Sequence, residues 1–134
     1  MYSVVDIETT GGKSSSNRVT EIAIVKTDGK KIIETFSTLV NPHRKIDKFV
    51  VQLTGITDAM VANAPDFESI IEKIDEFTKD TIFVAHNIGF DYSIIKREYR
   101  NADKVFKRNN LYWKARIANY RTNEGDYSCN IFTA

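Results

Sequence analysis

The sequence predicts an α/β fold, a mixed β-sheet flanked by helices, in a single domain of 134 residues. Three observations carry this prediction. The chain opens with three β-rich runs, two of which are joined by a strong hairpin signal. Two later segments place apolar residues at helical spacing, and a short β-rich run separates them. The expected order is therefore strand, strand, strand, helix, strand, helix, strand.

The first strand, residues 2–7, leads into two acidic residues and a glycine-rich turn. Residues i and i+2 of a strand share a face, so Asp6 and Glu8 point the same way while Ile7 between them points into the protein. Neighbouring carboxylates resist joint ionisation unless a cation lies between them, and their oxygens bind hard ions such as Mg²⁺. The alternative is that both acids decorate the solvent face of a half-buried strand.

The next two strands form a hairpin. Val19–Val25 and Ile32–Val40 are β-rich, and the Asp28-Gly29 pair between them favours a tight turn. With the first strand they would make an antiparallel meander.

A helical region follows the hairpin. Residues 46–64 contain a short helix and a loop, and Pro65-Asp66 then opens a longer helix. Five apolar residues of the longer helix fall at helical spacing, which indicates a stripe facing the core rather than a binding surface. They are Phe67, Ile70, Ile71, Ile74 and Phe77.

A fourth strand, Ile82–Ala85, passes through a Gly-containing turn into a helix with apolar residues at positions 90, 94, 95 and 99. Asp91 falls near the start of this helix, where a carboxylate serves as an N-terminal cap. His86 and Asn87 are expected to bond to nearby backbone in the turn. Taken singly, each of these residues has a purely structural explanation.

Taken together, the two acidic segments resemble the DnaQ-like 3′–5′ exonucleases, the proofreading superfamily that includes the epsilon subunit of bacterial DNA polymerase III. The first family motif resembles Val5-Asp6-Ile7-Glu8-Thr9-Thr10-Gly11, and the second resembles Val84-Ala85-His86-Asn87-Ile88-Gly89-Phe90-Asp91. Segments between them are also similar to the family: Glu21-Ile22-Ala23, Val40-Asn41-Pro42 and Leu53-Thr54-Gly55-Ile56-Thr57-Asp58. Residues 1–100 thus match the family, and residues 101–134 form a divergent tail.

The resemblance implies a ribonuclease-H-like fold, in which the first and fourth strands are neighbours and three carboxylates meet at one edge. It implies that Asp6, Glu8 and Asp91 are the catalytic residues and the metal ligands, holding two Mg²⁺ or Mn²⁺ ions roughly 4 Å apart for phosphodiester hydrolysis. Thr9 would hold the terminal nucleotide. Phe90 would pack beside the site or stack on a base, although burial in the core is the role we expect for it.

The family's third motif, a late histidine followed five residues on by an aspartate, has no counterpart. The two histidines, His43 and His86, precede or belong to the second motif, and neither Asp103 nor Asp126 has a histidine at the required offset. We therefore expect a poorly bound second metal and the loss of a general base, a contribution of about 10²- to 10⁴-fold in rate. A catalytic role for His86 is the less expected alternative. Truncation, frameshift and divergence all remain open as explanations of the tail.

Composition sets the remaining bounds. Residues are 42% hydrophobic and 28% charged, as in ordinary globular domains, and the net charge of +1 means that any nucleic-acid binding must be local. We expect no membrane segment and a cytoplasmic location, where the single Cys129 would stay reduced.

Two functions follow as hypotheses. The first is a 3′–5′ exonuclease, expected to act on DNA although RNA is equally compatible with the motifs, with single-stranded or 3′-ended nucleic acid as substrate. The alternative is a catalytically inactive module of the same fold that binds nucleic acid or a DNA polymerase. If the family's last helices are missing, a sheet face is left uncovered except for a partial cover by residues 112–120, so we also expect self-association.

Overall fold

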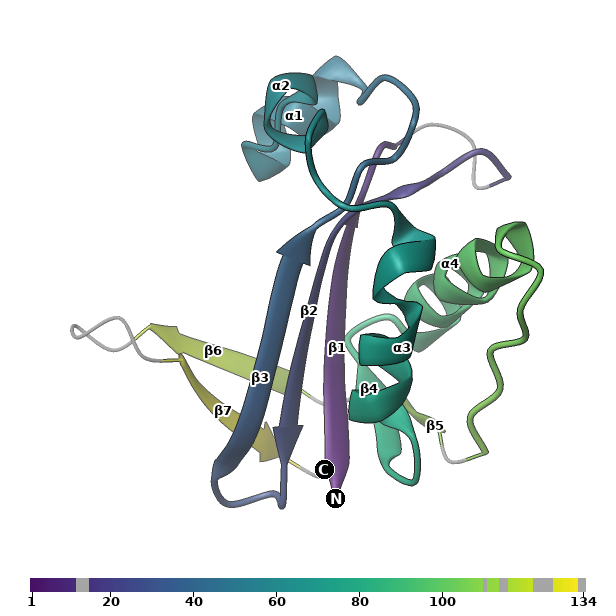
Figure 1. The fold of residues 1–134 in the computed structure, drawn as a ribbon. Helices are drawn as coiled ribbons and strands as arrows, with labels where there is room; N and C mark the ends of the chain where they lie inside the picture. Colours follow the sequence, from purple (N-terminus) through teal and green to yellow (C-terminus); the bar gives the residue numbers. More distant parts are fainter. Residues whose placement is uncertain (12–14, 110, 114–115, 122–126, 133–134) are drawn as a thin grey trace.

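The sheet is centred on β1 (Tyr2–Thr9) in a computed structural model that describes residues 1–11, 15–109, 111–113, 116–121 and 127–132. Five strands follow the order β3-β2-β1-β4-β5 (Figure 1). The β1–β2 and β2–β3 pairs are antiparallel, and the β1–β4 and β4–β5 pairs are parallel. The predicted mixed sheet, with its meander and its neighbouring first and fourth strands, is confirmed. The other strands are β2 (Val19–Thr27), β3 (Ile32–Leu39), β4 (Ile82–Ala85) and β5 (Leu111–Trp113).

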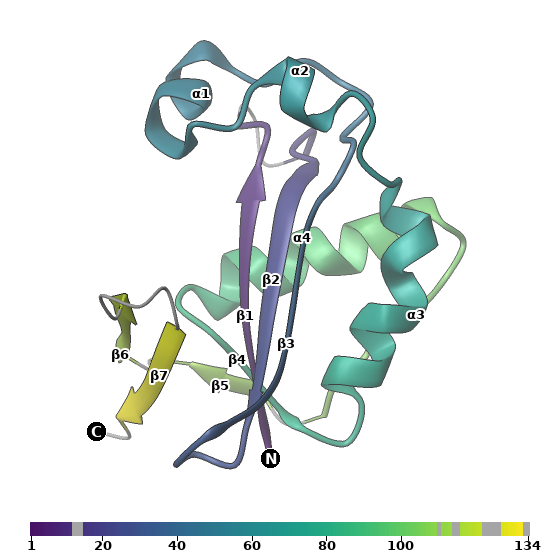
Figure 2. The ribbon, with the colours of Figure 1, turned by 60° about the vertical axis from the view of Figure 1, so that its left-hand side comes forward.

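Two helices cover one face of this sheet, namely α3 (Phe67–Thr78) and α4 (Ile88–Asn101) (Figures 1 and 2). Alternation along β1 divides its side chains between the two faces. Val5 and Ile7 are buried in the core beneath the helices, whereas Val4 packs with Val84 on the opposite face. Asp6 and Glu8 belong to that opposite face by the same alternation.

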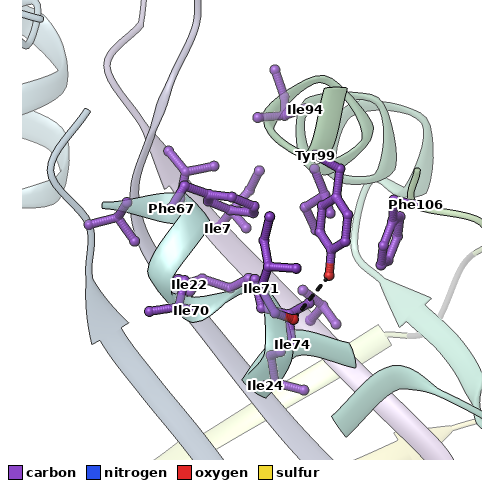
Figure 3. Close-up of a cluster of buried hydrophobic side chains, with 14 of the residues drawn as sticks. Ile7, Ile22, Ile24, Phe67, Ile70, Ile71, Ile74, Ile94, Tyr99 and Phe106 are labelled. Carbon is purple, nitrogen blue, oxygen red and sulfur yellow. Dashed lines mark hydrogen bonds between the residues drawn. The ribbon is translucent and has the colours of Figure 1, made fainter. Parts of the chain in front are cut away.

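The main core lies between the sheet and the two helices (Figure 3). All five apolar residues predicted for the longer helix are buried in it, which confirms the stripe on α3. Tyr99 of α4 is 1% exposed and packs edge-on against Phe67, with ring centroids 5.9 Å apart. Its hydroxyl donates to the carbonyl of Ile71 at 3.4 Å, so that the buried ring keeps a polar partner.

Between β3 and α3 the chain forms two short helices, α1 (Lys48–Thr54) and α2 (Asp58–Val61), where the sequence indicated one helix and a loop. Gly55 ends α1 in the left-handed region, with a φ of 76°, and Thr57 caps the start of α2. The segment forms two helices instead of one because Gly55 ends the first helix and Thr57 starts the second. Their apolar residues form a separate small core around Ile46.

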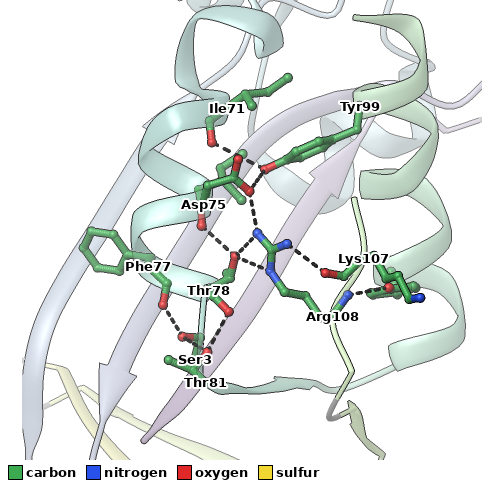
Figure 4. A network of polar contacts seen from close by, with 11 residues as sticks. Ser3, Ile71, Asp75, Phe77, Thr78, Thr81, Tyr99, Lys107 and Arg108 are labelled. Atoms are coloured by element: carbon green, nitrogen blue, oxygen red, sulfur yellow. Dashed lines mark hydrogen bonds and ion pairs between the residues drawn. The ribbon is translucent and has the colours of Figure 1, made fainter. Parts of the chain in front are cut away.

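A network of polar contacts ties the chain that follows α4 to the end of α3 (Figure 4). The Arg108 guanidinium donates to Asp75 Oδ1 at 2.5 Å and to Thr78 Oγ1 at 2.8 Å. Tyr99 also donates to Asp75 Oδ1, at 3.0 Å. At the end of β1 nearest the N-terminus, Ser3 donates to the carbonyl of Phe77 at 2.5 Å.

A second, more buried contact joins α4 to β2. Glu98 is 2% exposed and accepts hydrogen bonds from Arg18 Nε at 2.9 Å and from the backbone N–H of Val19 at 3.0 Å. A buried carboxylate with both a cation and a backbone donor satisfies its hydrogen-bonding requirement. This contact therefore holds the start of β2 against α4.

The chain after α4 forms three further strands. β5, the last strand of the expected order, pairs parallel with β4, and β6 (Arg116–Arg121) pairs antiparallel with β7 (Tyr127–Phe132). In both views this hairpin lies on the side of the sheet away from α3 and α4 (Figures 1 and 2). Within the described ranges no helix follows α4, and none of the helices is long and apolar enough to cross a bilayer. Asp126 lies outside the described residues, and the side chain of Cys129 is not described. The structure therefore does not test the hypothesis of an incomplete family domain.

Candidate active site

Two acidic side chains extend from the same face of β1 near its carboxyl end. Asp6 is exposed and Glu8 is half-buried, while Ile7 between them is 7% exposed and lies in the core. The predicted placement of the two carboxylates on one face is therefore confirmed. The four ion pairs among the described residues involve other acids, so no lysine or arginine there neutralises this pair.

Asp91 approaches the pair from the start of α4, although it is not the helix cap that the sequence predicted. The cap is Asn87, whose side chain accepts from the backbone N–H of Phe90 at 3.4 Å. Asp91 is the fourth residue of the helix and is 5% exposed. Its Oδ2 accepts from the backbone N–H of Asn87 at 3.3 Å, a reciprocal arrangement similar to a capping box. The helix begins one turn earlier than expected because asparagine caps as well as aspartate does.

The electrostatics show that the three acids share one environment. Burial and, after it, the nearby negative charge of Asp6 raise the pKa of Asp91 to about 6. Burial also raises the pKa of Asp6, although part of that residue reaches solvent. For Glu8 the pKa is raised by burial first and then by the charges of Asp6, Glu21 and Asp91. The carboxylates are thus close enough to oppose one another's ionisation.

A fourth carboxylate, Glu21, was missed as a site residue by the sequence reasoning. It lies directly opposite Glu8 in the β1–β2 pair, so the two side chains share a face. The pKa of Glu21 is raised by burial and by Asp6. The sequence offered two signals, the family resemblance of Glu21-Ile22-Ala23 and the alternation along β2, and the alternation becomes informative only once the register with β1 is known.

His86 occupies the turn between β4 and α4 and is exposed, as a turn residue should be. The parallel register pairs Val4 with Val84, which brings His86 to the level of Asp6 on the neighbouring strand. The positive charge that His86 can carry lowers the pKa of both Asp6 and Asp91. It is therefore a neighbour of the carboxylates, and its role in the chemistry stays a hypothesis.

The two expected substrate-binding residues flank the acids. Thr9 is 9% exposed and follows an irregularity in the β1–β2 pairing between Glu8 and Thr9. Phe90 is 37% exposed in the first turn of α4, so the expectation that it is buried in the core was wrong. Position 90 matches the apolar spacing of the helix, but Ile88 and Asp91 are the residues of the first turn that face the protein, and Phe90 lies outside that face.

The donor set fits a hard divalent cation. Carboxylates from β1, β2 and α4 are close enough to influence one another's pKa, and no lysine or arginine forms an ion pair with them among the described residues. Carboxylate oxygens are the ligands that Mg²⁺ and Mn²⁺ prefer. Among the described residues, however, no three His, Cys, Asp or Glu side chains are already arranged as a metal site.

The chain matches the family model described as "Exonuclease" (RNase_T) over residues 3–130. The chain belongs to this exonuclease family. The DnaQ-like resemblance of the two acidic motifs is thereby confirmed, and with it the ribonuclease-H-like fold.

Individual relatives of this exonuclease domain are much longer than the chain. It is 46% identical over 95 residues to a PolC-type DNA polymerase III of Caldanaerobacter subterraneus, covering 71% of the chain and 7% of the polymerase. Exonuclease X, solved with 5′-overhanging duplex DNA, is 32% identical with a TM-score of 0.59, covering 84% of the chain and 58% of that structure. Product-bound exonuclease I shares the fold at 15% identity, with a TM-score of 0.75 over 95% of the chain and 35% of that structure.

Proposed function

We propose that this domain is a 3′–5′ exonuclease that hydrolyses phosphodiester bonds at the 3′ ends of DNA with two divalent cations. The observation that carries the proposal is the electrostatic coupling of Asp6, Glu8 and Asp91: burial raises the pKa of all three, and the charge of Asp6 also raises the pKa of Glu8 and Asp91. Structural ion pairs do not explain these acids, and strongly perturbed carboxylates cluster at functional sites.

In this proposal Asp6, Glu8 and Asp91 hold Mg²⁺ or Mn²⁺, and Glu21 adds negative charge beside them. Bound ions would supply an activated water and stabilise the leaving 3′ oxygen. Thr9 and the backbone near it would position the terminal nucleotide. The exposed ring of Phe90 offers a surface for a base, because stacking tolerates any sequence.

The relatives support DNA as the substrate class and a polymerase as a context. Exonuclease X was solved with an overhanging DNA duplex and exonuclease I with a dT13 oligonucleotide. A PolC-type polymerase contains a segment that is 46% identical to this chain.

The test uses two labels on one single-stranded DNA in the presence of Mn²⁺. A 5′ label should yield a ladder that shortens with time, whereas a 3′ label should be released at once as a mononucleotide. Asp6→Asn should abolish both patterns, and Lys30→Gln, at the far end of the sheet, should not. Release of 5′-labelled mononucleotide first would contradict the direction proposed here.

A second candidate is an inactive nucleic-acid-binding module, favoured by the lack of a third-motif histidine in this sequence. Calorimetric titration with Mn²⁺ separates the two candidates. Cation binding that Asp6→Ala abolishes, together with no detectable cleavage, would support the inactive module. Cation binding equally strong in Asp6→Ala would contradict the shared site altogether.

A further inference from the structure

A basic segment lies next to the candidate active site and has no part in it so far. Three cations, Arg44, Lys45 and Lys48, occur with the single acid Asp47 in residues 44–48, so the segment carries a charge of +2 where the whole chain carries +1. All three cations are exposed, and none forms an ion pair within the described ranges. The segment therefore offers local positive charge of the kind that nucleic-acid binding would need.

The segment is fixed in place against the end of β1. The backbone N–H of Asp47 donates to the carbonyl of Thr10 at 2.9 Å, two residues beyond Glu8. Gly11 packs so closely that a Cβ there would lie 2.4 Å from a methyl carbon of Val50. In Figure 2, α1 lies beyond the carboxyl end of β1. If the 3′ end of a nucleic-acid strand lay at the carboxylates, residues 44–48 would lie close to the phosphates a few nucleotides upstream of that end.

Buried contacts hold the segment in shape. Ile46 is 2% exposed in the small core under α1 and α2, and its backbone N–H donates to Asp58 Oδ1 at 2.9 Å. Because Ile46 is anchored, Lys45 and Lys48 are displayed on a rigid base. They line an open hollow of about 420 Å³ together with Arg44, Ile46 and Asp47.

An aromatic ring completes the surface. Phe49 is 72% exposed, and no aromatic or cation partner covers it among the described residues. Cations that track phosphates beside a ring that stacks on bases are the usual composition of a single-strand binding surface.

We propose that Arg44, Lys45, Lys48 and Phe49, here called the strand-binding ridge, bind single-stranded nucleic acid a few nucleotides upstream of its 3′ end. The proposal rests on the function proposed above and adds a second contact region to it. The ridge holds the sugar-phosphate backbone through its cations and a base through Phe49. Short products that end at the carboxylates do not reach it.

The experiment measures binding of 5′-fluorescein dT12 and dT2 by anisotropy in EDTA, over a range of salt concentrations. Lys45→Gln/Lys48→Gln should weaken dT12 binding and reduce the slope of log K against log salt by about 1.4, since each phosphate contact contributes about 0.7 on single strands. Binding of dT2 should be unchanged. Phe49→Ala should weaken dT12 binding about 5- to 150-fold with an unchanged salt slope.

The matched control is Lys30→Gln/Lys31→Gln in the β2–β3 turn, which removes the same charge far from Glu8 and should leave dT12 binding unchanged. Thermal melts of all variants should agree, because the altered side chains are exposed. If the wild-type protein degrades strands but the Lys45/Lys48 variant binds dT12 like wild type, only the ridge is wrong. If the wild type binds no dT12, the ridge is wrong, whereas the proposed function is judged by the cleavage assay in Mn²⁺, because the carboxylates need a cation to accept a phosphate.

Discussion

Asp91→Asn should stabilise the metal-free protein at neutral and alkaline pH. Asn mimics the protonated carboxyl, which the buried site favours over the charged form. The pKa of Asp91 rises from 3.8 to about 6 on folding, and about two units at roughly 1.36 kcal/mol each amount to about 3 kcal/mol. The backbone N–H of Asn87 keeps an acceptor in the variant, because the amide oxygen of asparagine can replace Oδ2.

The pH dependence has a defined sign. Because the folded pKa is the higher one, the folded protein binds more protons between about pH 4 and pH 6, and its stability falls as pH rises through this window. Asp91→Asn removes this loss. Its advantage over wild type should be largest, about 3 kcal/mol, above pH 7 and should vanish near pH 4.

Urea unfolding followed by circular dichroism in EDTA, at pH 4.5, 6 and 8, measures these differences. Asp103→Asn is the matched control, because it removes one exposed aspartate charge and should change little at any pH. Saturating Mg²⁺ should then stabilise wild type by more than the variant, since a ligand that binds only the folded state adds stability. A variant that is less stable than wild type at pH 8, or an advantage at pH 4.5 as large as that at pH 8, would refute the reasoning.

Four further predictions follow from the same structure. Under matched Mn²⁺, the domain should degrade 3′-ended strands at least about 10²-fold more slowly than a relative with the third motif; comparable rates that His86→Ala abolishes would instead make His86 the general base. Gly11→Ala should cost about 2 kcal/mol or more in urea unfolding, because of its φ of 76° and its contact with Val50; an unchanged midpoint would contradict this packing. Glu98→Ala should cost about 3 kcal/mol, since it leaves the Val19 N–H buried without a partner, while Glu98→Gln should cost less; equal losses would argue against that hydrogen bond. Light scattering at micromolar concentration should show a species larger than the monomer, and a monodisperse monomer with a cooperative melt would rule out self-association.

The parts of the fold that local patterns specify were predictable. The stripe on α3 and the Asp28-Gly29 turn depend only on neighbouring residues, and both are confirmed. Glu21 was not predictable, because its place beside Glu8 depends on the register of two strands. Long-range pairing of this kind is set by the packing of the whole sheet rather than by either strand alone.

Capping and exposure set a second limit on the sequence reasoning. Asn87 and Asp91 are both good caps four residues apart, and the choice between them depends on where α4 meets β4. Phe90 has the spacing of a core residue but is 37% exposed, while Asp91 beside it is 5% exposed and Ile88 of the same turn packs against the core. Periodicity identifies the approximate apolar face of a helix and does not decide which residues at the edge of that face are buried.

The contacts of Arg108 have a consequence for protein engineering. The Arg108 guanidinium joins the chain after α4 to α3 through Asp75 and Thr78. The backbone N–H of Arg108 donates to the hydroxyl of Tyr92 in α4 at 3.1 Å. Arg108, which precedes β5 in the chain, thus joins α3 to α4. The polypeptide beyond β5 could accordingly be exchanged for another sequence, or fused to a different protein, without removing the Arg108 contacts that hold α3 and α4 together.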